Sequence, residues 1–260
     1  MGFSEKLKEE FEKSSIPAKL TVYKRTDSTN TRAKEHASAS GERCAHFFVS
    51  ETQSEGRGRM GRSFLSEEGG LYLSALIYPD MPIADAVKLT VFSAVEVCRL
   101  LEEFYSVNVG IKWVNDIYIG EKKLSGILTE GAFDESGEKF SYAVIGIGIN
   151  FDKTEFPTEL KNIATDLESE CGIKADKAEF AIALIKSILS FSPAKTSEYI
   201  EEYRKKSIMI GRRVKVLSPL GDYFAEVQSI DDDAALIVKN DKNEIIRLYT
   251  GDVSIKIGGN

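Results

Sequence analysis

Cysteine and histidine are scarce in this sequence of 260 residues, which holds three cysteines and two histidines. Cys44, Cys98 and Cys171 are odd in number, lie far apart and include no C-x-x-C pair, so the sequence favours neither a disulfide framework nor a zinc knuckle. With only His36 and His46 available, a Ser-His-Asp triad and a histidine-based zinc site are both disfavoured. This cysteine usage fits a reducing cytoplasm.

Long apolar runs and an excess of positive charge are missing as well. No uncharged apolar stretch reaches the roughly 18 residues that a membrane span needs, and residues 1–6 lack the apolar segment of a signal peptide. The net charge of −7 argues against general nucleic-acid binding, which usually requires a basic face. The sequence also contains no repeats and no Walker A pattern. We therefore expect a cytoplasmic protein without a membrane segment.

A loop rich in glycine and arginine is the most informative feature that is present. Residues 56–62 read GRGRMGR and place three arginines and three glycines together. Glycine lets backbone N–H groups approach a ligand closely, and arginine offers a planar, permanently charged fork to carboxylate and phosphate oxygens. The loop therefore suits a small anionic ligand. Taken alone, it fits a solvated basic loop or an RNA-contacting segment equally well.

The spacing of apolar residues predicts helices and strands up to about residue 207, and only short strands after residue 211. The strand at 140–149 is largely apolar, so we expect it at the centre of a sheet. The strands after 211 recur about every ten residues, which is typical of a small barrel. Helices are predicted at residues 4–13, 29–38, 83–105, 176–191 and 196–207. Strands are predicted at residues 20–23, 45–50, 71–77, 109–113, 116–119, 123–130 and 140–149, and then at 214–217, 225–227, 235–238, 245–248 and 253–256.

Four further motifs accompany the glycine–arginine loop in a fixed order. Residues 26–30 read TDSTN, residues 112–116 read KWVND, residues 122–128 read KKLSGIL, and residues 146–150 read GIGIN. The series resembles the catalytic domain of the biotin–protein ligase family over residues 20–151, with a weaker similarity towards the C-terminus. The resemblance implies an α+β fold, in which a mixed β-sheet flanked by helices, like that of class II aminoacyl-tRNA synthetases, is followed by a small SH3-like β-barrel. It divides the chain into a catalytic domain, residues 1–208, and a C-terminal barrel, residues 209–260.

The resemblance implies an ATP-dependent ligase that activates biotin as biotinyl-5′-AMP and transfers biotin to a lysine of a biotin carboxyl carrier domain, such as that of acetyl-CoA carboxylase. In this reaction an anionic carboxylate attacks an anionic α-phosphate, so fixed positive charge, oriented N–H donors and a metal ion are required. Lys123, Arg57 and Arg59 are the candidates for the catalytic charge, and the backbone of residues 56–61 for the donors. Asp116 is the candidate ligand for Mg²⁺, an ion that prefers one or two carboxylates together with phosphate oxygens.

The resemblance also assigns two sets of binding residues. The biotin set comprises Ser28, Thr29, Asn30, Gln53, Gly56, Arg57, Gly58, Arg59, Lys123, Gly126, Gly146 and Gly148. The ATP and adenylate set comprises Arg59, Arg62, Phe64, Lys112, Asn115, Asp116, Asn150 and Lys256.

Three positions depart from the family pattern, and several motifs have plainer interpretations. Met60 stands where many relatives have a basic residue, Phe64 stands where tryptophan is common, and Val114 replaces the proline of K-W-P-N-D. When the family resemblance is set aside, residues 28–30 fit a helix N-cap. Residues 115–116 then fit a turn, residues 122–123 an exposed hairpin edge, and residues 146–150 a central strand with small side chains.

Two other functions compete with the biotin ligase. One is a lipoate or octanoate ligase on the same fold, against which the complete GRGRMGR segment argues. The other is a biotin-responsive regulator that binds DNA. Because TDSTN begins after 25 residues, too few for a helix-turn-helix domain, we expect a short form without an N-terminal DNA-binding domain and no DNA partner. The sequence leaves open which acceptor protein is used and whether the chain is a monomer or a homodimer.

Overall fold

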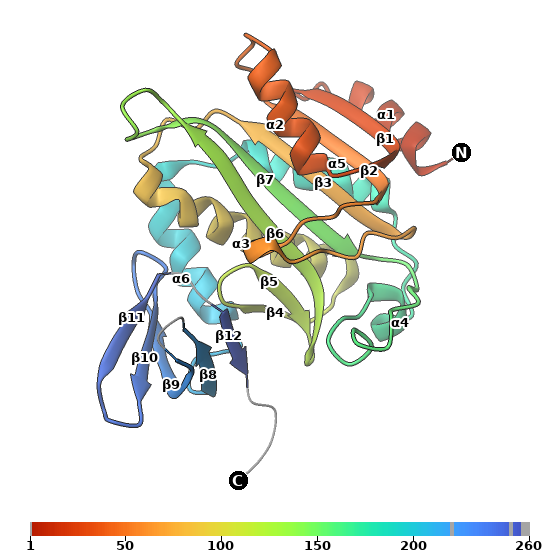
Figure 1. Cartoon of the computed structure of the whole chain (residues 1–260). Coiled ribbons are helices and arrows are strands. Elements are labelled where there is room, and N and C mark those ends of the chain that lie inside the picture. The colour runs from red at the N-terminus through yellow and green to blue at the C-terminus, as the bar shows by residue number, and fades with distance from the viewer. Residues whose placement is uncertain (1, 219–220, 250–251, 256–260) are drawn as a thin grey trace.

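The computed structural model describes residues 2–218, 221–249 and 252–255 (Figure 1). Within them, seven strands form the main sheet in the order β1-β2-β3-β7-β6-β5-β4. β1 and β2 are parallel, and the other neighbours are antiparallel. The sheet is therefore mixed, as predicted, and β7 lies at its centre. The strands are β1 (Lys19–Thr26), β2 (His46–Gln53), β3 (Gly70–Ile77), β4 (Val109–Lys112), β5 (Asp116–Ile119), β6 (Lys122–Phe133) and β7 (Phe140–Asn150).

The two faces of the main sheet are covered unequally. One face packs against the helices α1 (Phe3–Lys13), α3 (Ala86–Tyr105), α5 (Lys177–Leu189) and α6 (Thr196–Lys206), which share the large hydrophobic core with it. The other face carries the single helix α2 (Thr29–Ala39), packed on β2, β3 and β7 (Figure 1). α2 covers only a small apolar cluster of Ala33, Phe48, Leu76 and Val144. The rest of this face is left for a binding site.

Strand alternation decides which β7 residues reach the open face. Side chains along a strand point alternately to opposite faces. Ile145 belongs to the large core, whereas Val144 belongs to the cluster under α2. Gly146 and Gly148 therefore lie on the α2 face, and their lack of side chains hollows it.

One short helix was not predicted from the sequence. α4 (Leu167–Cys171) begins after Asp166, whose carboxylate accepts a hydrogen bond from the backbone N–H of Ser169 at 2.7 Å. Three 3₁₀ turns, Arg59–Gly61, Ile83–Asp85 and Pro193–Lys195, complete the helical elements of the described residues. None of the helices in the described residues combines the length and the apolar character needed to cross a membrane.

The C-terminal part consists only of strands, as predicted. Five described strands form an antiparallel sheet in the order β11-β10-β9-β8-β12. The α+β fold class, with a small β unit after the mixed sheet, is thereby confirmed, whereas the division at residues 208 and 209 stays a prediction. The strands are β8 (Arg213–Leu217), β9 (Tyr223–Ile230), β10 (Leu236–Asn240), β11 (Ile245–Leu248) and β12 (Asp252–Ile255).

The C-terminal sheet and α6 hold the segment between β4 and β5. The indole Nε1 of Trp113 donates to the carbonyl oxygen of Ala234 at 2.8 Å, and the hydroxyl of Tyr203 donates to the carbonyl oxygen of Val114 at 2.9 Å. Both Trp113 and Tyr203 are buried. This packing fixes the backbone immediately before Asn115 and Asp116.

Candidate active site

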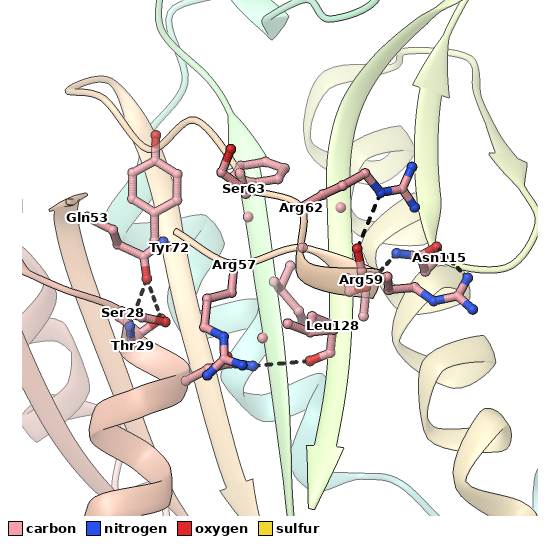
Figure 2. A pocket seen from close by; sticks show the side chains of 18 of the residues that line it. Ser28, Thr29, Gln53, Arg57, Arg59, Arg62, Ser63, Tyr72, Asn115 and Leu128 are labelled. Carbon is pink, nitrogen blue, oxygen red and sulfur yellow. Dashed lines mark hydrogen bonds between the residues drawn. The ribbon is translucent and has the colours of Figure 1, made fainter. Parts of the chain in front are cut away.

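A cavity opens on the α2 face of the main sheet, between the start of α2, the glycine–arginine loop and strands β6 and β7. Figure 2 shows its lining from close by: Ser28, Thr29 and Gln53 lie at one side, and Arg59, Arg62 and Asn115 lie at the other. The cavity is lined by Ser28, Thr29, Asn30, Gln53, Arg57, Gly58, Arg59, Arg62, Ser63, Phe64, Tyr72, Asn115, Asp116, Lys123, Gly126, Ile127, Leu128, Gly146, Ile147 and Gly148.

The side at the start of α2 is a set of polar groups that fix one another. The carboxamide oxygen of Gln53 accepts from the backbone N–H of Thr29 at 2.7 Å and from its hydroxyl at 3.0 Å. The Gln53 amide donates in turn to the hydroxyl of Ser66 at 2.9 Å. Ser28 occupies the N-cap position of α2, but its side chain makes no capping hydrogen bond with a described residue. The plain N-cap interpretation of Ser28 is therefore not fulfilled, and Ser28 is one of the residues that line the cavity.

The network continues across the sheet through residues that were not predicted from the sequence. The hydroxyl of Ser74 on β3 lies 2.7 Å from the Thr29 hydroxyl and 2.5 Å from the Asn30 carboxamide oxygen. The Asn30 amide donates to the carboxylate of Glu130 on β6 at 2.9 Å. Hydrogen bonds thus connect residues from four elements. Gln53 ends β2, Thr29 and Asn30 begin α2, Ser74 lies on β3 and Glu130 lies on β6.

The floor of the cavity is made of glycines that side chains approach closely. A Cβ atom added at Gly146 would overlap the carboxamide of Asn30. A Cβ at Gly148 would lie 2.7 Å from the ring of Phe64, and one at Gly126 would lie 3.0 Å from Lys123 Nζ. Glycine is therefore favoured by contact rather than by backbone conformation, most strongly at Gly146 and Gly148.

The glycine–arginine loop pairs with itself. The N–H of Gly58 donates to the carbonyl oxygen of Arg62 at 2.7 Å, and the N–H of Phe64 donates to that of Gly56 at 2.8 Å. The tip turns through left-handed conformations at Met60 (φ 55°) and Gly61 (φ 74°). In this structure the N–H of Gly58 closes the loop's own turn. The expectation that the 56–61 backbone offers N–H donors to a ligand stays a prediction.

The cationic side of the cavity joins two neighbouring strands and the loop. Lys123 Nζ on β6 lies 2.7 Å from the Asp116 carboxylate on β5, and 5.6 Å from the centre of the Phe64 ring. Arg59 donates to the side-chain oxygen of Asn115 at 3.3 Å, and the Asn115 amide donates to the carbonyl oxygen of Ile127 at 2.7 Å. Positive charge is thereby concentrated at one end, as adenylate chemistry requires.

Asp116 is the one carboxylate among the described residues that line the cavity. The described residues include no group of three or more His, Cys, Asp and Glu side chains able to hold a metal ion by themselves. Mg²⁺ commonly binds through one or two carboxylates together with substrate phosphates. This donor set fits an ion brought in by a nucleotide, with Asp116 as its protein ligand.

Three described residues of the predicted sets, Gly56, Lys112 and Asn150, do not line the cavity. The Lys112 ammonium donates to the Tyr118 hydroxyl at 3.4 Å, the buried Asn150 amide donates to the carbonyl oxygen of Thr165 at 3.0 Å, and Gly56 packs against Ser66 and the Phe64 backbone. Lys256 lies outside the described residues. The structure brings the other predicted residues together around the cavity, and the roles assigned to all of them stay predictions.

Sequence reasoning missed several residues that belong to the site. Ser63, Tyr72, Ile127, Leu128 and Ile147 line the cavity, and Ser74 and Glu130 support it. Strand alternation offered a signal for some of them, because Leu128 and Glu130 follow Gly126 at intervals of two, and Ser74 follows Tyr72 in the same way.

Comparison with known proteins identifies the family. Residues 22–150 match the biotin/lipoate A/B protein ligase family, and residues 209–256 match the biotin protein ligase C-terminal domain. A biotin protein ligase from Aquifex aeolicus, solved in complex with biotin and ATP, superposes with a TM-score of 0.77 at 30% identity, over 92% of this chain and 99% of that one. The chain belongs to the biotin/lipoate protein ligase family, which confirms the resemblance seen in its motifs.

Curated proteins that are similar to this chain in sequence point to the same family. The bifunctional ligase/repressor BirA of Bacillus subtilis is 33% identical over 218 residues, which is 80% of this chain and 65% of that protein. The biotin–[acetyl-CoA-carboxylase] ligase of Mycobacterium tuberculosis is 28% identical over 245 residues, covering 90% of this chain and 88% of that one. This chain thus spans about two thirds of the length of the BirA protein that it matches.

Proposed function

We propose that the chain is an ATP-dependent ligase that activates biotin as biotinyl-5′-AMP and transfers the biotinyl group to a lysine of a biotin carboxyl carrier domain. The observation that carries this proposal is the difference between the two sides of the cavity, one neutral and polar and the other cationic (Figure 2). Neutral hydrogen-bonding groups of Ser28, Thr29 and Gln53 suit a cyclic urea at one side, and Lys123 and Arg59 suit a phosphate at the other.

The first chemical step joins the carboxylate of biotin to the α-phosphorus of ATP and releases pyrophosphate. Both reactants are anionic, so Lys123, Arg57 and Arg59 are proposed to offset the charge that builds up on the phosphoryl oxygens. Mg²⁺ held by Asp116 would offset part of the phosphate charge when it is bound with ATP. The ion pair of Lys123 with Asp116 holds the ammonium group at this end of the cavity.

In the second step the amine of the acceptor lysine attacks the carbonyl carbon of the adenylate, and AMP leaves with the electron pair of the broken C–O bond. We propose a biotin carboxyl carrier domain as the acceptor. Support comes from the Mycobacterium tuberculosis relative, whose name specifies acetyl-CoA carboxylase as its target. A cytoplasmic location is proposed with it, supported by three unpaired thiols at Cys44, Cys98 and Cys171.

The test is ATP–pyrophosphate exchange with purified protein and Mg²⁺, in parallel with biotin, lipoate and octanoate. Exchange that depends on biotin alone supports the proposal, and exchange with lipoate or octanoate alone would replace it by the lipoate or octanoate ligase. The transfer step is tested by adding a biotin carrier domain and measuring by mass spectrometry whether one lysine gains one biotinyl group.

The regulatory alternative is tested separately, because the Bacillus subtilis relative is described as both ligase and repressor. α1 exposes the carboxylates of Glu5 and Glu12, which would be repelled by DNA phosphates, whereas Glu9 and Glu10 are paired with Lys13 and Lys6. We therefore expect no specific retardation of a biotin-operon promoter fragment at near-physiological salt with biotinyl-AMP present. Specific retardation by this chain would establish the regulator.

A further inference from the structure

Glu130 on β6 is a carboxylate outside the cavity lining that contacts two residues of that lining, Asn30 and Arg57. One carboxylate oxygen accepts from the Asn30 amide at 2.9 Å. The other accepts from the Lys34 ammonium at 2.8 Å and lies 3.4 Å from the guanidinium of Arg57. The Glu130 side chain is only 21% exposed. One group thus touches both the start of α2 and the glycine–arginine loop.

The contact with Glu130 decides how the Asn30 carboxamide is turned. An ionised carboxylate only accepts hydrogen bonds, so it must face the NH₂ group of the amide. The opposite face of the amide, its oxygen, lies 2.5 Å from the Ser74 hydroxyl and against Gly146. Burial acts to raise the pKa of Glu130, but hydrogen bonds from Lys34 and Asn30 and the nearby charges bring the pKa below its usual value. Glu130 is therefore ionised at neutral pH, and the Asn30 amide has one orientation.

The contact with Arg57 is of a different kind. The Arg57 side chain is 47% exposed, and partly exposed ion pairs contribute little stability. Such a pair keeps the guanidinium beside the cavity and gives way easily to a ligand anion. Glu130 therefore fixes Asn30 firmly and holds Arg57 loosely.

We propose that Glu130 is a positioning residue for biotin recognition, which orients the Asn30 amide in the cavity and keeps Arg57 beside it before ligand binds. This inference rests on the proposed function. It makes its own kinetic prediction. Losing a group that orients Asn30 should weaken the binding of biotin more than it slows the chemical step.

The first test is Glu130→Gln, measured by biotin-dependent pyrophosphate exchange. We expect the KM for biotin to rise about tenfold, which corresponds to about 1.4 kcal/mol, with kcat and the KM for ATP changed by less than about twofold. Glu102→Gln is the matched control, because Glu102 is also a carboxylate ion-paired with a lysine, Lys206, at 2.7 Å, and lies away from the cavity. A fall in kcat at unchanged KM for biotin, or kinetics equal to wild type, would overturn the inference.

The second test needs no catalysis. The side-chain amide signal of Asn30 in an NMR spectrum of the ligand-free protein, assigned through its loss in Asn30→Asp, should shift in Glu130→Gln and stay in place in Glu102→Gln. If wild type shows no biotin-dependent exchange, the proposed function fails while this shift still tests the contact. An unmoved Asn30 signal overturns the inference whatever the activity.

A second variant is available if Glu130→Gln does not fold. Glu130→Asp keeps the charge on a shorter side chain, so it should give a smaller rise in the KM for biotin. An unchanged KM for biotin counts against the inference.

Discussion

Lys123 is held by the Asp116 carboxylate at 2.7 Å, at the cationic side of the cavity. Lys123→Ala should lower the rate of biotin-dependent pyrophosphate exchange by about 30- to 10³-fold, because losing a charge that acts on the transition state costs about 2–4 kcal/mol. The control is Lys139→Ala, which breaks an ion pair of equal length with Asp80 on an exposed surface. Exchange at the wild-type rate in Lys123→Ala would show that Lys123 has no catalytic role.

Arg59 donates to Asn115 at 3.3 Å from the glycine–arginine loop. An arginine at the phosphate matters most once the adenylate exists, so Arg59→Gly should speed the dissociation of biotinyl-AMP by about 10- to 100-fold, as expected for a hydrogen bond to a charged group worth about 1.5–3 kcal/mol. Escaped adenylate should then biotinylate unrelated lysines in a mixed lysate. Arg213→Gly, which breaks an exposed ion pair with Asp241, is the control. An unchanged dissociation rate would point to Arg57 or Arg62 instead.

Whether a residue of the site could be predicted from the sequence depends on how far along the chain its partners lie. The motif residues could be predicted because each motif is local and resembles a family. Strand alternation indicates the face on which Ser74 and Glu130 lie. Their contacts with Asn30 could not be predicted, because they join positions 44 and 100 residues apart. The hydrogen bond from the N–H of Gly58 to the carbonyl oxygen of Arg62 is local, but the loop motif gave no indication of it.

At the scale of elements, β7 depends on glycine where it passes under α2. Gly146→Ala should displace the Asn30 carboxamide, because the added Cβ would overlap it. We expect weaker biotin binding by calorimetry and a free energy of unfolding lower by about 1–3 kcal/mol, the usual cost of overpacking. Gly41→Ala is the control, since its Cβ would meet no described atom within 4 Å. Unchanged biotin affinity in Gly146→Ala would remove Asn30 from the binding site.

Helices and strands of ordinary length could be predicted closely, because periodic apolar residues specify them locally. The long segment at 83–105 is an example: its apolar positions at helical spacing correspond to α3 and the 3₁₀ turn before it. α4 escaped prediction because five residues give too few turns for periodicity, and its start depends on a single cap at Asp166. The order of strands in the main sheet also lay beyond local patterns.

For the molecule as a whole, the buried His46 links stability to pH. Burial, with the nearby charges of His36 and Lys19, lowers its pKa from 6.5 to about 4. The unfolded chain therefore takes up this proton first, so the stabilising contribution is complete above pH 6.5 and is lost as the pH falls towards 4. Between about pH 7.5 and about pH 5 we expect a loss of about 2 kcal/mol from this group.

The measurement is urea unfolding of wild type and His46→Gln at both pH values. Carboxylates titrate in both proteins, so the difference between the two curves isolates the histidine. Wild type should lose about 2 kcal/mol more than the variant on acidification. Equal losses in the two proteins would show that His46 titrates alike in the folded and unfolded chain.

The hydrogen bond between Trp113 and Ala234 makes the fluorescence of this tryptophan a reporter of the contact. The sequence contains one tryptophan, so all indole fluorescence comes from a buried ring that lies two residues before Asn115 and bonds to the turn between β9 and β10. The wavelength of maximum tryptophan emission should be short in the native protein and should increase when the C-terminal sheet separates from the main sheet. A single fluorophore, with no dye attached, thus follows the junction of the two sheets during unfolding and during nucleotide binding.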